Sequence, residues 1–298
     1  MSNPIMKHLL GHTAVKLQCL DKNKDYVASA TGFFLRRSGN LYLYTCWHVV
    51  TGIESWQPLL FSRAVEQKKR RFLTVCSQNV TKLVTNTGQP AGESIGGKRE
   101  FDLPLYDAYE SPTWHQDKRD VPHEDLNAIK IRVPFWHDAV AFPLSPDQPI
   151  SPLQVIDEEH FFRHTKSLGA GRFQGRSYSP GDRVFIVGYP YGFSTAGDLQ
   201  PEAIVLVRHV ASMRLRYAGL HGRQVLLDGP GAPGMSGSPV FVETDRGLEL
   251  IGAYTHVIYP DNPGGKAEKT TALGVVTELT QSWGAIPLVP QSEIGEPE

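Results

Sequence analysis

The sequence lacks an excess of charge of either sign, since 30 Lys and Arg residues stand against 31 Asp and Glu residues in 298. Proteins that bind nucleic acid or anionic lipid usually carry a basic excess, so we expect neither partner. Long hydrophobic runs are also missing: the longest, 184–188 and 203–207, are far too short to span a bilayer. Residues 1–10 have no apolar core and no small-residue cleavage site, which argues against a secretory signal.

Cysteine is scarce. The three residues Cys19, Cys46 and Cys76 form an odd set with no CxxC or Cys/His spacing typical of metal sites. Free thiols in a reducing compartment are the simplest interpretation. Together with the missing secretory signal, they predict a cytoplasmic location.

No long segment carries an apolar stripe of helical period, and residues 155–167 are predicted to form at most one short helix. Glycine (28) and proline (22) instead separate short segments in which apolar and polar residues alternate. Many short strands with frequent turns are typical of an all-β sandwich or a pair of barrels. The predicted strands are 15–19, 41–45, 129–133, 184–188, 203–210, 224–227, 240–242, 249–255 and 272–276.

Two segments, 85–124 and 141–180, interrupt this pattern. Residues 85–124, rich in Gly, Asp, Pro and Lys, are predicted to be an insertion, and strong strand signals resume only after 180. We therefore expect an N-terminal β-domain over 1–145, a C-terminal β-domain over 146–288 and a flexible tail over 289–298.

The strongest local signal is the Gly-Ala-Pro-Gly-Met-Ser-Gly-Ser-Pro-Val segment at 231–240. Glycines on both sides of Ser236 permit a tight turn that aims successive N–H groups into one concavity. Ser236 could attack a carbonyl there, while the N–H groups of Gly234 and Ser236 stabilise the oxyanion. A plain surface turn is the alternative.

A serine nucleophile needs a base and a group that orients the base. His48 ends the alternating segment 41–45 as it enters a turn, and Asp125 directly precedes the predicted strand 129–133. A core histidine and a turn aspartate are the alternatives. Rival acids within 85–124 are Asp102, Asp107, Asp117 and Asp120.

A metal site is a further alternative, because imidazoles and carboxylates crowd one segment of the chain. HExxH or a comparable helical spacing is missing there, so we expect no metal. The residues concerned are His115, Asp117, Asp120, His123 and Asp125.

Three segments together resemble the trypsin/chymotrypsin-like serine peptidases, particularly the bacterial HtrA-like branch without a PDZ domain. They are Thr-Cys-Trp-His-Val-Val at 45–50, Asp-Leu-Asn-Ala-Ile-Lys-Ile at 125–131 and Pro-Gly-Met-Ser-Gly-Ser-Pro-Val at 233–240. Their order His, Asp, Ser agrees with that family, and segments 30–35 and 180–190 resemble it too. The resemblance implies two antiparallel six-stranded β-barrels, an active site between them and a short C-terminal helix.

The resemblance also implies roles. His48 would be the general base, Asp125 its orienting acid and Ser236 the nucleophile of a serine endopeptidase without a cofactor. The strand containing Tyr254, Thr255, His256 and Val257 would bind the polypeptide substrate, with Tyr254 or His256 suited to an acidic or amide side chain before the scissile bond. A rim or core position for His256 is the alternative. Some restraint on such an enzyme is expected, and the alternatives are an ordering transition of the serine loop or of 85–124, a narrow substrate, or a regulatory protein partner. A catalytically silent binding module and a serine esterase are the alternatives.

Overall fold

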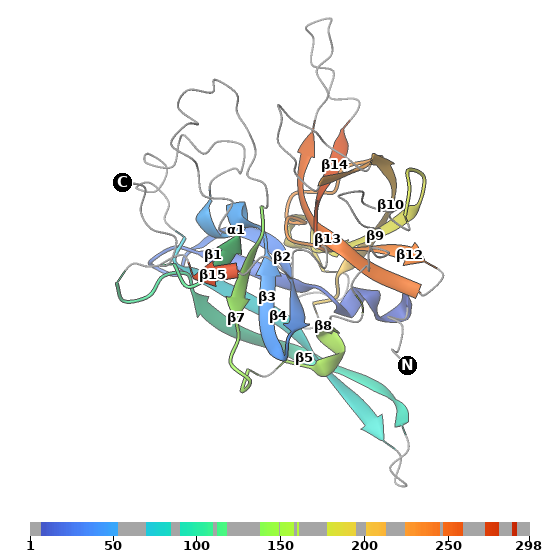
Figure 1. Ribbon diagram of the computed structural model, residues 1–298. Helices are drawn as coiled ribbons and strands as arrows, with labels where there is room; N and C mark the ends of the chain where they lie inside the picture. The colour runs from blue at the N-terminus through green and yellow to red at the C-terminus, as the bar shows by residue number, and fades with distance from the viewer. Residues whose placement is uncertain are drawn as a thin grey trace, which may run out of the picture.

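The computed structural model describes thirteen stretches of the chain, and its secondary structure is almost entirely β (Figure 1). The described residues are 7–52, 70–84, 90–109, 112–117, 138–148, 150–157, 160, 178–194, 201–212, 224–244, 247–258, 272–279 and 288–290. The short helical elements among them are η1 (Lys7–His12), α1 (Trp47–Thr51), η5 (Pro152–Gln154) and η7 (Pro190–Gly192). Within these stretches no helix has the length and hydropathy needed to cross a membrane.

Six strands of the C-terminal half close into an antiparallel barrel in the order β10-β11-β14-β13-β12-β9 (Figure 1). Val184, Val225, Met235, Val240 and Val276 are among the apolar side chains buried together in one cluster of this barrel. One of the two predicted barrels is thereby confirmed, since these six strands close on themselves. Its strands are β9 (Arg183–Gly188), β10 (Ile204–Ser212), β11 (Gln224–Leu227), β12 (Pro239–Thr244), β13 (Gly247–Ile258) and β14 (Leu273–Glu278).

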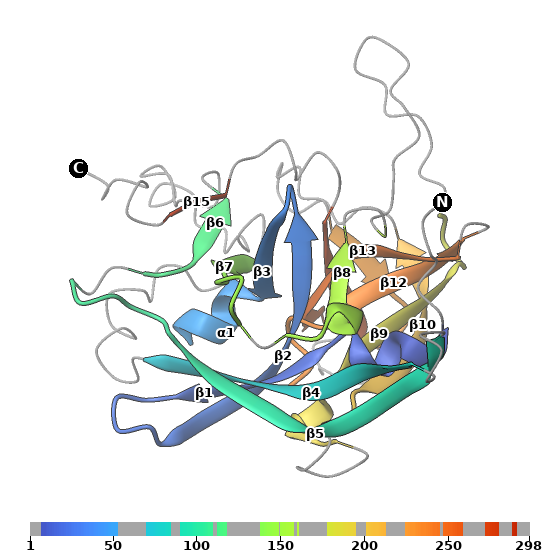
Figure 2. The same ribbon diagram turned by 90° about the horizontal axis from the view of Figure 1, so that it is seen from below.

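The other nine strands form one sheet, in the order β15-β6-β7-β3-β2-β1-β4-β5, with β8 paired to β2 (Figure 2). Over the described residues this sheet is open, so the second closed barrel is not seen. Its strands are β1 (Val15–Leu20), β2 (Tyr26–Arg37), β3 (Asn40–Thr45), β4 (Phe72–Val84), β5 (Pro90–Pro104), β6 (His115–Asp117), β7 (Val140–Pro143), β8 (Val155–Asp157) and β15 (Leu288–Pro290).

Several segments differ from the sequence-based expectation. Part of the predicted insertion is the long strand β5, which pairs with β4 from Phe72↔Pro104 to Val84↔Pro90. The composition of this segment is unfavourable for a strand, but the backbone pairing with β4 outweighs it. Val155–Asp157 is a strand that runs parallel to β2, where a short helix was predicted. The expected tail contains the end of β15, which pairs with β6. The predicted strand 129–133, and the C-terminal residues outside 288–290 where a helix was expected, lie outside the described residues.

A shared core joins the sheet and the barrel. Phe33 of β2 stacks on Tyr44 of β3 with ring centroids 5.6 Å apart, and both belong to the same buried cluster as Phe185, Tyr189 and Phe241 of the C-terminal half. Burying such aromatic surface contributes about 1.5–3 kcal/mol per side chain. This core therefore fixes the position of the His48 segment relative to the Ser236 segment.

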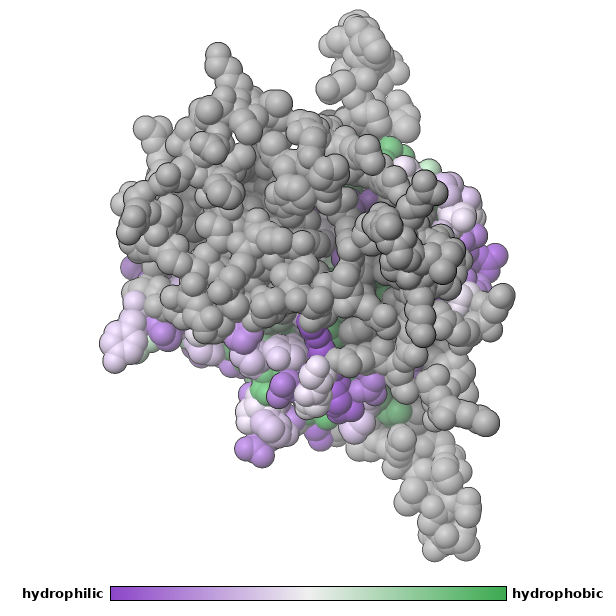
Figure 3. All heavy atoms as spheres, viewed as in Figure 1, coloured by the Kyte–Doolittle hydropathy of each residue, from purple (hydrophilic) through white to green (hydrophobic). Residues whose placement is uncertain are grey.

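The surface shows few apolar residues among those described. On the face in Figure 3, the coloured residues are mainly hydrophilic, with apolar ones scattered between them. The exposed large apolar side chains include Tyr109, Tyr191 and Phe193. Scattered residues of this kind need no covering partner.

Candidate active site

His48 lies in the short helix α1, directly after β3. The helix ends at Gly52, whose left-handed backbone (φ 74°) lets its N–H donate to the carbonyl of His48 at 3.0 Å. The Arg70 guanidinium donates to the same carbonyl at 3.2 Å and to that of Val49. The free carbonyls at the helix end are therefore paired, which holds the His48 backbone in place.

Asp138 holds the ring of His48. Its Oδ2 lies 2.6 Å from Nδ1 of His48, and its Oδ1 accepts the backbone N–H of His48 at 3.0 Å. The exposed fraction of the side chain is 1% for Asp138 and 15% for His48. Burial acts to raise the pKa of Asp138, but the charge of His48 and the hydrogen bonds from it outweigh burial, so the pKa lies below its usual range. The carboxylate is therefore ionised and fixes the orientation of the imidazole.

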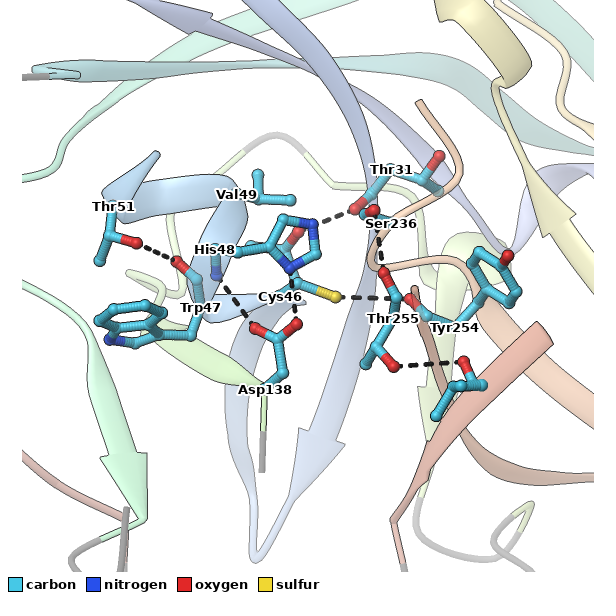
Figure 4. A network of polar contacts seen from close by, with 12 residues as sticks. Thr31, Cys46, Trp47, His48, Val49, Thr51, Asp138, Ser236, Tyr254 and Thr255 are labelled. Atoms are coloured by element: carbon cyan, nitrogen blue, oxygen red, sulfur yellow. Dashed lines mark hydrogen bonds and ion pairs between the residues drawn. The ribbon is translucent and has the colours of Figure 1, made fainter. Parts of the chain in front are cut away.

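Ser236 lies in the loop directly before β12. The His48 ring stands between Asp138 and Ser236, with its other edge turned toward Ser236 (Figure 4). The Ser236 hydroxyl donates to the carbonyl of Thr255 at 3.1 Å. The neighbouring Met235 side chain is fully buried in the barrel cluster and anchors the loop.

The same loop presents two N–H groups that the fold does not use. Met235, Gly237 and Ser238 donate their N–H groups to Ala232, Tyr254 and Met235, respectively. Those of Gly234 and Ser236 have no hydrogen-bond acceptor within the described residues. Gly234 has φ 91°, which turns the loop there. Two free N–H groups flanking a serine can stabilise an oxyanion.

Thr31 of β2 connects the sheet to the serine loop. Its hydroxyl donates to the Gly234 carbonyl at 2.8 Å and accepts the Tyr189 N–H at 3.0 Å, while its own N–H donates to the Ser236 carbonyl at 3.0 Å. Thr31 was not among the residues predicted for the site from the sequence. A chain separation of 203 residues between Thr31 and Gly234 explains why no local pattern revealed it.

Replacing Thr31 with valine is expected to lower the free energy of unfolding by about 2–4 kcal/mol, because the Tyr189 N–H and the Gly234 carbonyl would be left unpaired. The Gly234 peptide group would also be free to rotate, so for any reaction at this site we expect kcat to fall while KM changes little. Denaturant unfolding and steady-state kinetics of Thr31→Val measure both effects.

The matched control is Thr277→Val. Thr277 is equally buried, but its hydroxyl has no hydrogen-bond partner within the described residues. Removing an unpaired buried hydroxyl is expected to leave stability unchanged or to raise it. Equal destabilisation in the two variants would contradict the role given to the Thr31 hydroxyl.

Among the predicted acids, Asp125 and Asp120 lie outside the described residues, and Asp138 takes the position beside His48. Asp102 is bonded to Thr74 and Lys24 instead. A signal for Asp138 is present in the sequence: Asp-Ala-Val-Ala-Phe at 138–142 places an aspartate just before β7, as Asp125 precedes its own apolar run. Asp107 accepts the backbone N–H of Tyr109, and Asp117 lies in β6.

The predicted substrate strand is the end of β13. Tyr254 is buried, and its hydroxyl accepts the Gly231 N–H at 2.7 Å, so it supports the serine loop from inside the barrel. Thr255 supplies the carbonyl that Ser236 contacts. His256 and Val257 are partly exposed, and the pairing of β13 with β12 stops at Ala253. Beyond that point, one edge of β13 has no strand beside it within the described residues.

His256 lies within electrostatic reach of the His48–Asp138 pair. Its pKa is lowered, first by burial and then by the charge of His48, although Asp138 acts in the opposite direction. Its Nδ1 is buried and has no hydrogen-bond partner within the described residues. The ring is therefore neutral near pH 7 and has a polar atom without a partner close to the site.

The residues of the alternative metal site are only partly described. His115 and Asp117 belong to β6, and Asp120, His123 and Asp125 lie outside the described residues. A different trio does come together: ligand atoms of Cys46, His48 and Asp138 all lie within 4.8 Å of one another.

No protein-family model matches the sequence, and no curated protein matches it either. Among solved structures it is similar to "HtrA-type protease AlgW with tripeptide", at 12% identity and a TM-score of 0.42 over 90% of this chain and 56% of that one. It is also similar to the thermostable serine protease AL20 from an extremophilic microorganism, at 11% identity and a TM-score of 0.45 over 93% of this chain and 95% of that one. A third similar structure is the MamO protease domain of Magnetospirillum magneticum, at 14% identity and a TM-score of 0.45 over 94% of this chain and 98% of that one. The chain thus spans little more than half of the AlgW structure. These identities and TM-scores are too low to assign a function to the chain.

Proposed function

We propose that this chain is a serine endopeptidase that hydrolyses peptide bonds through an acyl-enzyme. Ser236 is the nucleophile, His48 the general base and Asp138, rather than Asp125, the orienting acid. The observation that carries the proposal is the two-point bond between Asp138 and His48, at 2.6 and 3.0 Å, with the far edge of the ring turned toward Ser236 (Figure 4).

In the reaction, His48 removes the Ser236 proton as the hydroxyl oxygen attacks the substrate carbonyl, and it then gives this proton to the leaving amine. Asp138 keeps the Nδ1 proton of His48 in place, so Nε2 is free to accept, and it stabilises the imidazolium that forms. The free N–H groups of Gly234 and Ser236 supply the donors for the oxyanion. A water molecule then releases the acyl group by the same steps in reverse.

An extended polypeptide suits this site, because the edge of β13 after Ala253 can add a substrate strand through backbone hydrogen bonds. His256 and Val257 lie on that edge. The neutral, partly exposed His256 is the candidate to contact an acidic or amide side chain before the scissile bond, whereas the Tyr254 hydroxyl is already engaged by Gly231.

A fluorophosphonate probe tests the proposal, because it labels only a serine whose base and oxyanion donors are in place. We expect labelling of the wild-type chain and none of Ser236→Ala. The matched control is Ser238→Ala, two residues along the same loop, which removes a buried hydroxyl without a hydrogen-bond partner among the described residues and should still be labelled.

Peptide libraries and small esters then separate the alternatives. Hydrolysis of peptides that depends on Ser236 supports the endopeptidase, and hydrolysis of esters alone would indicate a serine esterase. A chain that takes up no probe under any condition would favour the silent binding module.

A further inference from the structure

A cysteine sulfur, a potential metal ligand, lies close to the His48–Asp138 pair. The thiol of Cys46, two residues before His48, is fully buried and donates to the Tyr254 carbonyl at 3.4 Å. Its sulfur lies on the same side of the His48 ring as the Asp138 carboxylate (Figure 4). The sulfur, a ring nitrogen of His48 and a carboxylate oxygen of Asp138 all lie within 4.8 Å of one another. Acyl transfer uses the imidazole and the carboxylate but has no use for the thiol.

These three donors match the coordination chemistry of Zn²⁺. Zinc takes thiolate, imidazole and carboxylate ligands at roughly 2.0–2.3 Å in a tetrahedron, which sets its ligand atoms about 3.3–3.8 Å apart. The His48–Asp138 pair, now 2.6 Å apart, would have to open, and any donor pair near the 4.8 Å limit of the cluster would have to close.

The charges also balance. One thiolate and one carboxylate neutralise a divalent cation, so the occupied cluster would carry no net charge in a place where an unpaired charge is costly. A single thiolate and a single imidazole favour zinc or cadmium over magnesium or calcium, which prefer sites built from oxygen alone. His48, with 15% of its side chain exposed, is the accessible edge of the cluster.

We propose that Cys46, His48 and Asp138 form an inhibitory site for a soft divalent cation, with Zn²⁺ as the natural candidate. On binding, the Cys46 thiol releases its proton to solvent, the neutral His48 ring exchanges its Nδ1 proton for one on Nε2 through solvent, and Sγ, Nδ1 and a carboxylate oxygen take the cation. Water can fill the fourth position.

Inhibition follows because the cation replaces the Nδ1 proton. Asp138 then no longer stabilises an imidazolium, and the His48 ring, which carries its proton on Nε2, cannot accept the Ser236 proton. The inhibitory half of this inference rests on the proposed peptidase function, whereas the binding half does not.

Cadmium is the probe for binding, since thiolate–Cd²⁺ charge transfer gives an ultraviolet absorption band that needs no enzymatic activity. We expect the full chain to bind one equivalent with this band. Cys46→Ala should lose the band and weaken binding by about 100-fold or more. Cys76→Ala is the matched control, because Cys76 is also buried but pairs with Glu100. Cys46→Ser provides a second test if the alanine variant does not fold, since a hydroxyl is a poor ligand for cadmium.

A band that is absent from the wild-type chain, or that persists without Cys46, would overturn the binding site. Inhibition is measured separately as peptide hydrolysis with Zn²⁺ relative to the metal-free rate of the same variant, and we expect at least a tenfold loss in the wild type that Cys46→Ala does not show. Undiminished hydrolysis by the metal-bound wild type would overturn the inhibitory role. A band in a chain with no hydrolytic activity would support the metal site and count against the peptidase.

Discussion

Replacing Asp138 with asparagine is expected to lower kcat for peptide hydrolysis by about 10⁴-fold near neutral pH, with little change in KM. Asp138 accepts two hydrogen bonds from His48, one from the backbone and one from Nδ1. An asparagine amide could keep the first bond, but it would donate to Nδ1 and place the imidazole proton on Nε2. In that tautomer His48 cannot accept the Ser236 proton. Steady-state kinetics near neutral pH measure the loss.

Two other aspartates serve as comparisons. Asp228 makes the same two-point contact with His209, at 2.9 Å to both the N–H and Nδ1, but the pair is about half exposed. An exposed pair of this kind is worth at most about 1 kcal/mol, so Asp228→Asn should change kcat by only a few-fold. Asp125→Asn decides between the two candidate acids. A large loss in Asp125→Asn together with an active Asp138→Asn would show that the role given to Asp138 is wrong.

Gly237→Ala is expected to lower the free energy of unfolding by about 2–5 kcal/mol, from left-handed strain and overpacking together. Gly237 has φ 88°, and a Cβ there would lie 2.1 Å from the Thr31 carbonyl oxygen and 2.5 Å from Oγ1 of Thr45. Relief would require β2 to move away from the serine loop. The hydrogen bond from the Thr31 N–H to the Ser236 carbonyl would then break, so hydrolysis should fall as well.

Gly39→Ala isolates the contribution of the backbone. Gly39 has φ 81° in the turn between β2 and β3, but nothing lies within 4 Å of an added Cβ. This variant should lose only the roughly 1–2 kcal/mol of a left-handed alanine and retain full activity. Urea unfolding of both variants gives the comparison, and a Gly237 variant no less stable than the Gly39 variant would contradict the close packing of β2 on the serine loop.

The barrel strands were predictable because their signal is local. In β9, β12 and β14, short apolar runs lie between turns rich in glycine and proline, and the structure places them in the closed barrel. β5 was missed because its glycine-rich, charged sequence is typical of a loop, and only its long pairing with β4 makes it a strand. β8 was missed because three residues carry too little pattern to separate a strand from a helix.

The same distinction applies to the site. Ser236 is recognisable from the glycines beside it, and His48 from the strand just before it. Both signals lie within a few residues, so the sequence alone identified the two residues as candidates. Two aspartates, Asp125 and Asp138, each precede an apolar run, and local pattern cannot rank them. The structure selects Asp138, because its carboxylate contacts His48 although the two residues are 90 positions apart in the sequence.

The amino-acid sequence by itself determined the β architecture of the C-terminal half and the two segments that carry the imidazole and the hydroxyl, because short apolar runs and glycine-bounded turns are short-range properties. Only the tertiary structure decided which carboxylate holds His48, that Thr31 ties the serine loop to β2, and that the Cys46 sulfur joins the pair. Each of these contacts depends on how the open sheet packs against the barrel through their shared core, and no local stretch of sequence encodes that packing.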